Sequence, residues 1–248
     1  MSKVILVTGS NAGIGFSLVQ QLAAKGHTVY VASRKEDAGN EAVAKIKAAN
    51  ASAAVKLVQL DVTDSKSIAA AVQKITSDEG KLNVLVNNAG VADFTVQHNA
   101  STPNLDAVRT GIETNLIGLM AVTSAFLPLL RKAHTADVPS VILNVSTGMA
   151  SNTVMSSFTL PAFVYPVIAY NTSKAAANSY TVALAFELRD EGIKVNTVSP
   201  GFTATKLNGF AAGGKTIEEG AAVLLPWCLL GKDGATGKFA DEKGELPW

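Results

Sequence analysis

Tyr170 and Lys174 lie four residues apart, in a stretch that continues into the helix-favouring run 175–177. On a helix, side chains at positions i and i+4 lie on the same face, so a phenol and an ammonium group would lie side by side. A phenol ordinarily has a pKa of about 10, and a neighbouring cation stabilises its anion. Such a tyrosine can exchange a proton with a substrate. The same spacing also occurs on solvent-exposed helix surfaces, so the catalytic interpretation depends on the rest of the chain.

A glycine-rich loop near the N-terminus is the first element that would position this pair. The loop joins an apolar stretch, residues 4–7, to an amphipathic segment, residues 16–25, which indicates a buried strand followed by a helix. We assign Gly9 to a tight turn, Gly13 to the close approach of the backbone to a pyrophosphate, and Gly15 to packing of helix on strand. The helix N-terminus would attract the phosphates. The predicted cofactor contacts here are Gly9, Ser10, Asn11, Gly13, Ile14 and Gly15.

Further motifs follow the glycine loop in a fixed order along nearly the whole chain. They are Asn87-Asn88-Ala89-Gly90, Thr114-Asn115-Leu116, Asn144-Val145-Ser146-Thr147-Gly148, Tyr170 with Lys174, and Ser199-Pro200-Gly201-Phe202-Thr203. With the Thr-Gly-x-x-x-Gly-x-Gly loop, they resemble the short-chain dehydrogenase/reductase family in its short, single-domain form. The stretches 187–196 and 230–248 look like members that reduce carbonyl compounds with NADPH.

This resemblance implies a role for each matching side chain of the catalytic group. Tyr170 would be the general acid and base, and Lys174 would stabilise the phenolate and hold the nicotinamide ribose. Asn115 would hold a water in the proton relay. The hydroxyl that orients the substrate falls on Thr147, where the family usually has serine, and Ser146 is the alternative.

The resemblance also extends the cofactor site beyond the glycine loop. Asp61 and Val62 would contact the adenine ring, and the Pro-Gly turn would lie beside the nicotinamide. The further cofactor contacts implied in this way are Asp61, Val62, Asn88, Ala89, Gly90, Tyr170, Lys174, Pro200, Gly201 and Thr203.

The choice between the two nicotinamide cofactors is predicted from the end of the second strand. An acidic residue at position 33 would bind the adenosine ribose hydroxyls, but Ser33 is there instead. Arg34 follows, and a guanidinium is suited to binding a 2′-phosphate. Glu36 and Asp37 are interpreted as the acidic first turn of the next helix. The sequence therefore predicts NADP(H), with Ser33 and Arg34 at the adenosine ribose.

Alternation of apolar strands with helical patterns predicts an α/β fold, with a Rossmann-like, doubly wound parallel sheet of about seven strands and helices on both faces. We expect one domain over residues 1–248, with a substrate loop or lid around residues 203–215. The expected strands are residues 4–8, 28–33, 55–60, 84–87, 141–145, 194–198 and 236–239.

Composition excludes several classes of function. A net charge of +1 without a basic stripe argues against nucleic-acid binding. We expect no membrane span, because we find no run of about 18 apolar residues, and no intrachain disulfide, because Cys228 is the lone cysteine. His27, His98 and His134 lack zinc-ligand spacing, so no metal is expected. These features favour a soluble cytoplasmic protein, and they leave monomer, homodimer and homotetramer open.

The segment between Thr147 and Tyr170 is apolar and about ten residues longer than the family resemblance leads us to expect. It either packs on the core or forms an apolar substrate pocket together with Phe94, Phe202 and Phe210, and we favour the pocket. A small hydrophobic ketone, aldehyde or alcohol is then the expected substrate. Two alternatives remain: an isomerase, dehydratase or cyclase on the same fold, and a non-catalytic dinucleotide-binding protein.

Overall fold

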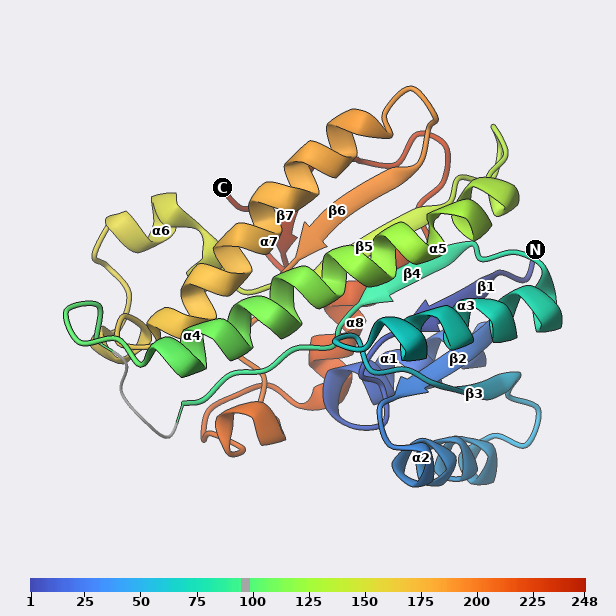
Figure 1. The fold of residues 1–248 in the computed structure, drawn as a ribbon, viewed down its shortest axis with the longest axis horizontal. Helices are drawn as coiled ribbons and strands as arrows, with labels where there is room; N and C mark the ends of the chain where they lie inside the picture. Colours follow the sequence, from blue (N-terminus) through green and yellow to red (C-terminus); the bar gives the residue numbers. More distant parts are fainter. Residues whose placement is uncertain (95–98) are drawn as a thin grey trace.

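The computed structural model describes residues 1–94 and 99–248, and it contains an eight-stranded sheet in the order β3-β2-β1-β4-β5-β6-β7-β8 (Figure 1). The strands are β1 (Val4–Val7), β2 (Thr28–Ser33), β3 (Val55–Gln59), β4 (Val84–Asn87), β5 (Val141–Val145), β6 (Lys194–Val198), β7 (Phe239–Asp241) and β8 (Gly244–Glu245). Neighbouring strands from β3 to β7 are parallel, and β8 is antiparallel to β7. The predicted Rossmann-like sheet is confirmed, with one strand more than expected.

The last parallel strand begins three residues later than the sequence predicted. Residues 236–239 were expected to form it, but β7 is Phe239–Asp241. Thr236 instead uses its side-chain oxygen to accept a hydrogen bond from the Val195 backbone N–H, at 3.0 Å. Gly237 has a φ of +70°, which bends the chain before regular strand geometry can begin.

Helices cover both faces of the sheet (Figure 1). They are α1 (Gly13–Ala24), α2 (Glu36–Ala49), α3 (Ser65–Glu79), α4 (Leu105–Ile112), α5 (Leu119–Ala133), α6 (Asn152–Ser156), α7 (Ile168–Glu187) and α8 (Ile217–Cys228). One core packs α3, α5 and α7 against the sheet, and the other packs α1, α2 and α8 against its opposite face. Within β1, Leu6 faces the first core and Ile5 and Val7 face the second, as the period of two in a strand requires. Glu36 and Asp37 form the acidic first turn of α2, as predicted.

Helices α4 and α5 are joined by a π-helical turn, η1 (Glu113–Gly118), into a continuous helix. By length and composition this helix, Leu105–Ala133, is long and apolar enough to cross a membrane, a feature that the absence of an unbroken apolar run in the sequence did not indicate. Phe126 and Leu130 are fully buried in the core against the sheet, which is the packing of a core helix.

The chain's last residues are bonded to the segment that follows β5. Ser151 donates a hydrogen bond from its hydroxyl to the Pro247 carbonyl at 2.6 Å, and Thr153 donates one to the Trp248 carbonyl at 2.8 Å. The Trp248 ring also packs against Phe239 of β7, with ring centroids 5.5 Å apart. The tail therefore anchors the start of the segment that leads from Thr147 to Tyr170.

Candidate active site and cofactor cleft

The glycine loop between β1 and α1 has the backbone geometry that a dinucleotide needs. Gly9 and Gly13 both have a φ of +61°, a conformation that favours glycine. A Cβ on Gly9 would lie 2.8 Å from the Ala89 Cα, so glycine is required for the loop to lie against the end of β4. A Cβ on Gly13 would meet nothing within 4 Å, which leaves open space beside the α1 N-terminus. A Cβ on Gly15 would collide with the side-chain amide of Asn88. Glycine is therefore required at this position because α1 begins against the loop that follows β4.

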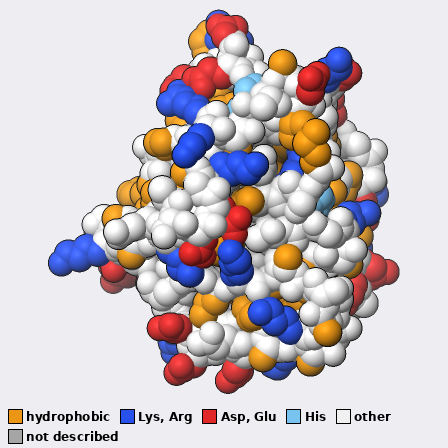
Figure 2. Space-filling view, turned by 90° about the vertical axis from the view of Figure 1, so that its right-hand side faces the viewer, with side chains coloured by type: hydrophobic (Ala, Val, Ile, Leu, Met, Phe, Trp, Pro, Cys, Tyr) orange, Lys and Arg blue, Asp and Glu red, His pale blue; other side chains and the backbone are white. Residues whose placement is uncertain are grey.

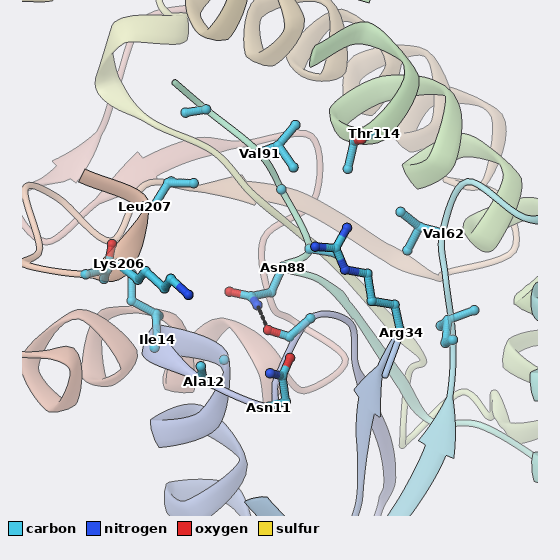
Figure 3. Close-up of a pocket in the computed structure, with 18 of the residues that line it drawn as sticks. Asn11, Ala12, Ile14, Arg34, Val62, Asn88, Val91, Thr114, Lys206 and Leu207 are labelled. Atoms are coloured by element: carbon cyan, nitrogen blue, oxygen red, sulfur yellow. Dashed lines mark hydrogen bonds between the residues drawn. The ribbon is translucent and has the colours of Figure 1, made fainter. Parts of the chain in front are cut away.

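Thr8, which the sequence analysis did not assign, ties this loop to the loop after β4. Its Oγ1 accepts hydrogen bonds from the backbone N–H groups of Asn88 and Ala89, both at 2.9 Å. In return, the Asn88 side-chain amide donates to the carbonyls of Thr8 and Gly9, at 2.8 and 3.1 Å, the second of which is visible in Figure 3. Both loops lie at the carboxyl ends of β1 and β4, where the strand order reverses and ligands of such sheets bind.

A cleft of about 760 Å³ opens at this point (Figure 3). The predicted cofactor contacts that line it are Gly9, Asn11, Gly13, Ile14, Gly15, Arg34, Asp61, Val62, Asn88, Ala89 and Gly90. The lining residues that the sequence analysis did not assign to the cofactor are Ala12, Leu60, Thr63, Val91, Ala92, Thr114, Thr205, Lys206, Leu207, Phe210 and Ile217. A glycine cradle beside a helix N-terminus, in a cleft of this size, fits a dinucleotide.

The other predicted cofactor contacts lie outside the lining of this cleft. Ser10 is fully buried, and its hydroxyl donates to the Val7 carbonyl at 2.7 Å, so it shapes the loop from within. Ser33 donates to the Lys35 carbonyl at 2.7 Å. Pro200, Gly201 and Thr203 follow β6. Thr203 is buried against Gly220, and Thr205, two residues later, lines the cleft instead.

Arg34 extends from the end of β2 into the cleft, as Figure 3 shows. Across from it, the Asp61 carboxylate accepts hydrogen bonds from the Thr63 backbone N–H and hydroxyl, at 3.0 and 2.7 Å. These bonds, with a smaller contribution from Arg34, hold the pKa of Asp61 below its usual value. Lys35, the next residue after Arg34, does not line the cleft.

Tyr170 and Lys174 lie on α7 on the same face of the helix, as predicted. The Lys174 side chain is 4% exposed, and its Nζ donates to the Val145 carbonyl at 2.8 Å and lies 6.0 Å from the centre of the Tyr170 ring. Burial raises the pKa of Tyr170 to about 12 and lowers the pKa of Lys174 to about 8. From the sequence, Lys174 was expected to stabilise the phenolate form of Tyr170. In the structure burial is the dominant influence, because both groups are removed from water.

Asn115 sits in the π-helical turn and connects three parts of the site. Its Nδ2 donates to the Val91 carbonyl and to the Ser173 hydroxyl, both at 2.9 Å, and its Oδ1 accepts from the Val91 N–H at 2.8 Å. Ser173 in turn donates to the Tyr170 carbonyl at 2.8 Å. A Cβ on Gly90 would lie 3.2 Å from Asn115 Oδ1 and 3.4 Å from Lys174 Nζ. The cleft wall, Asn115 and the Tyr170 helix are thus held together, and Ser173 is a member that the sequence analysis missed.

The two candidate hydroxyls after β5 differ in their surroundings. Ser146 is buried, and its hydroxyl donates to Asn178 Oδ1 at 2.9 Å. Thr147 is half-buried, and its Oγ1 accepts a hydrogen bond from the Met149 N–H at 3.3 Å. Within the described part of the chain, no acceptor is bonded to the Thr147 hydroxyl hydrogen. Of the two, Thr147 is the better placed to donate to a ligand.

A second cavity, of about 230 Å³, adjoins Tyr170. Its lining residues are Val91, Ala92, Asp93, Ala107, Thr110, Gly111, Ala169 and Tyr170, so it shares Val91 and Ala92 with the larger cleft. Phe94 packs edge-on against the Tyr170 ring at 5.4 Å, whereas Phe210 lines the cofactor cleft. In the 148–165 segment, Phe158 and Phe163 are 80% and 66% exposed. No residue of that segment lines either of the two cavities, so the expected apolar pocket walled by this segment stays a prediction.

Two further expectations concern groups away from the cleft. His27 and His134 each accept a backbone hydrogen bond through Nδ1, and His98 lies outside the described residues. In residues 1–94 and 99–248, no three side chains of the metal-ligating types His, Cys, Asp and Glu are grouped as a metal site. Cys228 is buried in the core.

A doubly wound sheet with a glycine-cradled cleft and an adjacent Tyr-Lys pair, in which the lysine is buried, defines a dinucleotide-dependent oxidoreductase. The short chain dehydrogenase family matches the chain over residues 3–213, and the chain belongs to this family. It is 32% identical to short-chain dehydrogenase anuI of Penicillium roqueforti, over 98% of this chain and 95% of the relative. It is 30% identical to salutaridine reductase of Papaver somniferum, over 96% and 94%. The structure also superposes on NADPH-bound carbonyl reductase from chicken fatty liver, with a TM-score of 0.83, 27% identity and coverage of 100% of this chain and 99% of the other.

Proposed function

We propose that this protein is an NADP(H)-dependent oxidoreductase that reduces a ketone or aldehyde to an alcohol, or catalyses the reverse reaction. The observation that carries the proposal is the position of Tyr170, which lines a small cavity directly beside the dinucleotide cleft. A carbonyl group in that cavity would be within reach of both the phenol and the cofactor. Support also comes from similar proteins that are named as a salutaridine reductase and an NADPH-bound carbonyl reductase.

Each residue of the site has a role in this reaction. NADPH, when bound, supplies the hydride. Tyr170 donates its phenolic proton to the carbonyl oxygen in reduction and takes it back in oxidation. Lys174, held by the Val145 carbonyl, places a positive charge near the phenolate that forms and offsets part of the cost of burying that anion. Asn115 fixes the position of α7 through Ser173. As the family resemblance implies, it would also hold a water in the proton path.

The substrate that fits this site is a small, neutral, hydrophobic carbonyl compound or alcohol. Phe94 beside Tyr170 and the apolar residues Val91, Ala92 and Ala169 in the lining of the small cavity favour an apolar ligand. We further propose that residues 1–248 act as one cytoplasmic domain and that the loop at 203–215 is a lid over the site.

The test of this function is a panel of hydrophobic ketones and aldehydes, monitored by the nicotinamide absorbance. We expect NADPH oxidation with stoichiometric alcohol formation for part of the panel. If NADPH binds but no carbonyl compound causes its oxidation, and a cofactor-neutral conversion is lost in Tyr170→Phe, the isomerase, dehydratase or cyclase alternative is correct. If NADPH binds and neither kind of conversion is detected, the non-catalytic alternative replaces the proposal.

Separate removal of the Thr147 and Ser146 hydroxyls tests which of them orients the substrate. We expect Thr147→Ala to lower kcat/KM by about 10- to 100-fold, because it removes a hydrogen bond to the carbonyl oxygen that carries negative charge in the transition state. Ser146→Ala should change kcat/KM by less than about threefold, since that hydroxyl is bonded to Asn178. Thr147→Ser is the matched control and should keep most of the activity. Loss of activity in Ser146→Ala alone would reverse the assignment.

Arg34 is expected to set the preference for NADPH. Arg34→Ala should raise the Kd for NADPH by about 10- to 100-fold, because a charge-assisted contact with the 2′-phosphate is lost, and should change the Kd for NADH by less than about threefold. Lys35→Ala is the matched control, because it removes the adjacent cation that does not line the cleft. Titration of nucleotide fluorescence measures both constants. An equal effect of Arg34→Ala on the two cofactors would contradict this assignment.

A further inference from the structure

Lys206 lies in the wall of the dinucleotide cleft that comes from the loop after β6. It begins the short 3-10 turn η4 (Lys206–Asn208) and lines the cleft together with Leu207 and Phe210. Figure 3 shows its side chain extending from this wall toward Asn88, above the glycine loop that carries Ala12 and Ile14. Its ammonium group is thus directed at the side of the cleft where α1 begins.

Lys206 lies opposite the glycine loop and the N-terminus of α1, and few other charged residues line the cleft. The charged lining residues are Arg34, Asp61 and Lys206, and Asp61 is engaged by Thr63. Within residues 1–94 and 99–248, the Lys206 ammonium group makes no hydrogen bond or ion pair, and only the backbone carbonyl of this residue is bonded, to the Gly209 N–H at 3.3 Å. By contrast, Lys215 of the same loop pairs with Glu242 at 2.6 Å. A cation in this position favours a negatively charged ligand at the α1 N-terminus, where backbone N–H groups also attract anions.

The loop that carries Lys206 is anchored at its base. Ala204 donates its backbone N–H to the Lys215 carbonyl, and Lys215 donates its own to the Phe202 carbonyl, both at 2.9 Å. The ion pair with Glu242 fixes the same point to the turn between β7 and β8. The two ends of the loop are therefore held side by side by these hydrogen bonds.

The tip of the loop is organised around Asn208. Its Oδ1 accepts a hydrogen bond from the Thr205 N–H at 3.0 Å, and its Nδ2 donates to the Thr203 carbonyl at 2.9 Å. Phe210 also donates its backbone N–H to the Thr205 carbonyl at 2.8 Å. The tip is therefore held as one unit, and Lys206 is presented on a defined support rather than on an open coil.

We propose that Lys206 binds the pyrophosphate of the dinucleotide and is carried over it by the loop at 203–215. Recognition is then divided between two cations: Arg34 binds the 2′-phosphate, which only NADP(H) carries, and Lys206 binds the pyrophosphate, which both nicotinamide cofactors carry. This inference rests on the proposed function, since it requires a dinucleotide in the cleft. It adds a residue that the glycine-loop pattern does not contain.

Variants of the two cations should differ in which ligands they affect. Binding measurements can show this difference without any catalytic assay. We expect Lys206→Met to raise the Kd values of NADPH, NADH and ADP-ribose by a similar factor, about 5- to 20-fold, because all three ligands contain the pyrophosphate. Adenosine 2′-monophosphate, which lacks it, should bind unchanged. Arg34→Met should give the reverse pattern: NADPH and adenosine 2′-monophosphate should bind more weakly, whereas the Kd values of NADH and ADP-ribose should be nearly unchanged. Isothermal calorimetry and competition against NADPH fluorescence supply the constants.

Two control variants separate a specific contact from a general loss of charge or of folding. Lys206→Arg keeps the charge and should bind ADP-ribose within about threefold of the wild type. Lys45→Met removes an exposed lysine of α2 that lines neither cavity, and it should leave every constant unchanged. Circular dichroism melting curves confirm that each variant is folded.

Unchanged NADH and ADP-ribose binding in Lys206→Met would overturn the role of Lys206 while leaving the proposed function intact. A selective loss of NADPH binding would also overturn it, because Lys206 would then bind the 2′-phosphate. Failure of the wild-type protein to bind any of the dinucleotides would instead reject the proposed function, and the role of Lys206 with it.

Discussion

Replacement of Tyr170 by phenylalanine is expected to lower kcat/KM for carbonyl reduction by about 100- to 10,000-fold, the usual contribution of a positioned general acid. Phenylalanine keeps the ring that packs against Phe94 at 5.4 Å and removes only the hydroxyl group. Folding and cofactor binding should therefore be preserved. The measurement is steady-state kinetics with the best substrate of the panel, together with the NADPH Kd.

Tyr165 supplies a matched control for this prediction. It precedes Tyr170 by five residues, its hydroxyl donates weakly to the Met155 carbonyl at 3.4 Å, and it lines neither cavity. Tyr165→Phe should keep at least a third of the activity. A Tyr170→Phe variant as active as Tyr165→Phe would show that another group, or water, transfers the proton.

Replacement of Lys174 by methionine is expected to remove most activity and at the same time to stabilise the fold at neutral pH. Burial lowers the Lys174 pKa from 10.5 to about 8, so at pH 7 the folded protein holds a charge that is better solvated in the unfolded chain. The shift corresponds to a penalty on the order of 3 kcal/mol. Loss of the hydrogen bond to the Val145 carbonyl offsets about 1 kcal/mol of the gain.

The pH dependence distinguishes this explanation from a change in packing. Because the folded pKa is lowered, the penalty is fully present below pH 8, decreases between pH 8 and 10.5, and is absent above 10.5. Urea denaturation should show Lys174→Met as more stable than the wild type at pH 7 by about 1 to 2 kcal/mol, and this advantage should disappear by about pH 10. The exposed-site variant Lys45→Met should differ from the wild type by less than about 0.5 kcal/mol at both pH values. A wild type that is the more stable protein at pH 7 would contradict the prediction.

The centre of the sheet was predictable because β1, β4 and β5 are buried along their whole length and are almost entirely apolar. The glycine loop was predictable for a related reason, since backbone conformations with positive φ at Gly9 and Gly13 require a specific residue type. Strand β8 was missed because two exposed residues, Gly244 and Glu245, carry no hydrophobic pattern. The start of β7 depended on hydrogen bonds of Thr236 and Gly237 to β6, which no local pattern reveals.

Contacts between distant parts of the chain account for what was missed at the site. Thr8 and Asn88 are 80 residues apart, and Asn115 meets Ser173 across 58 residues. The spacing of motifs placed these segments at the same edge of the sheet, but not the individual bonds. Likewise, the sequence indicated a loop at 203–215, whereas its fold around Asn208 decided that Thr205 and Lys206 line the cleft.

The bonds from Ser151 and Thr153 to the carbonyls of Pro247 and Trp248 have a consequence for how substrate range can evolve in this chain. Residues 246–248 do not line the cofactor cleft, so we expect substitutions there to leave nucleotide affinity largely unchanged. Because two of these residues accept hydrogen bonds from Ser151 and Thr153, such substitutions would act on the segment between Thr147 and Tyr170. Under the proposed function, substitutions at 246–248 would be a way to alter substrate range without changing the residues that line the cofactor cleft.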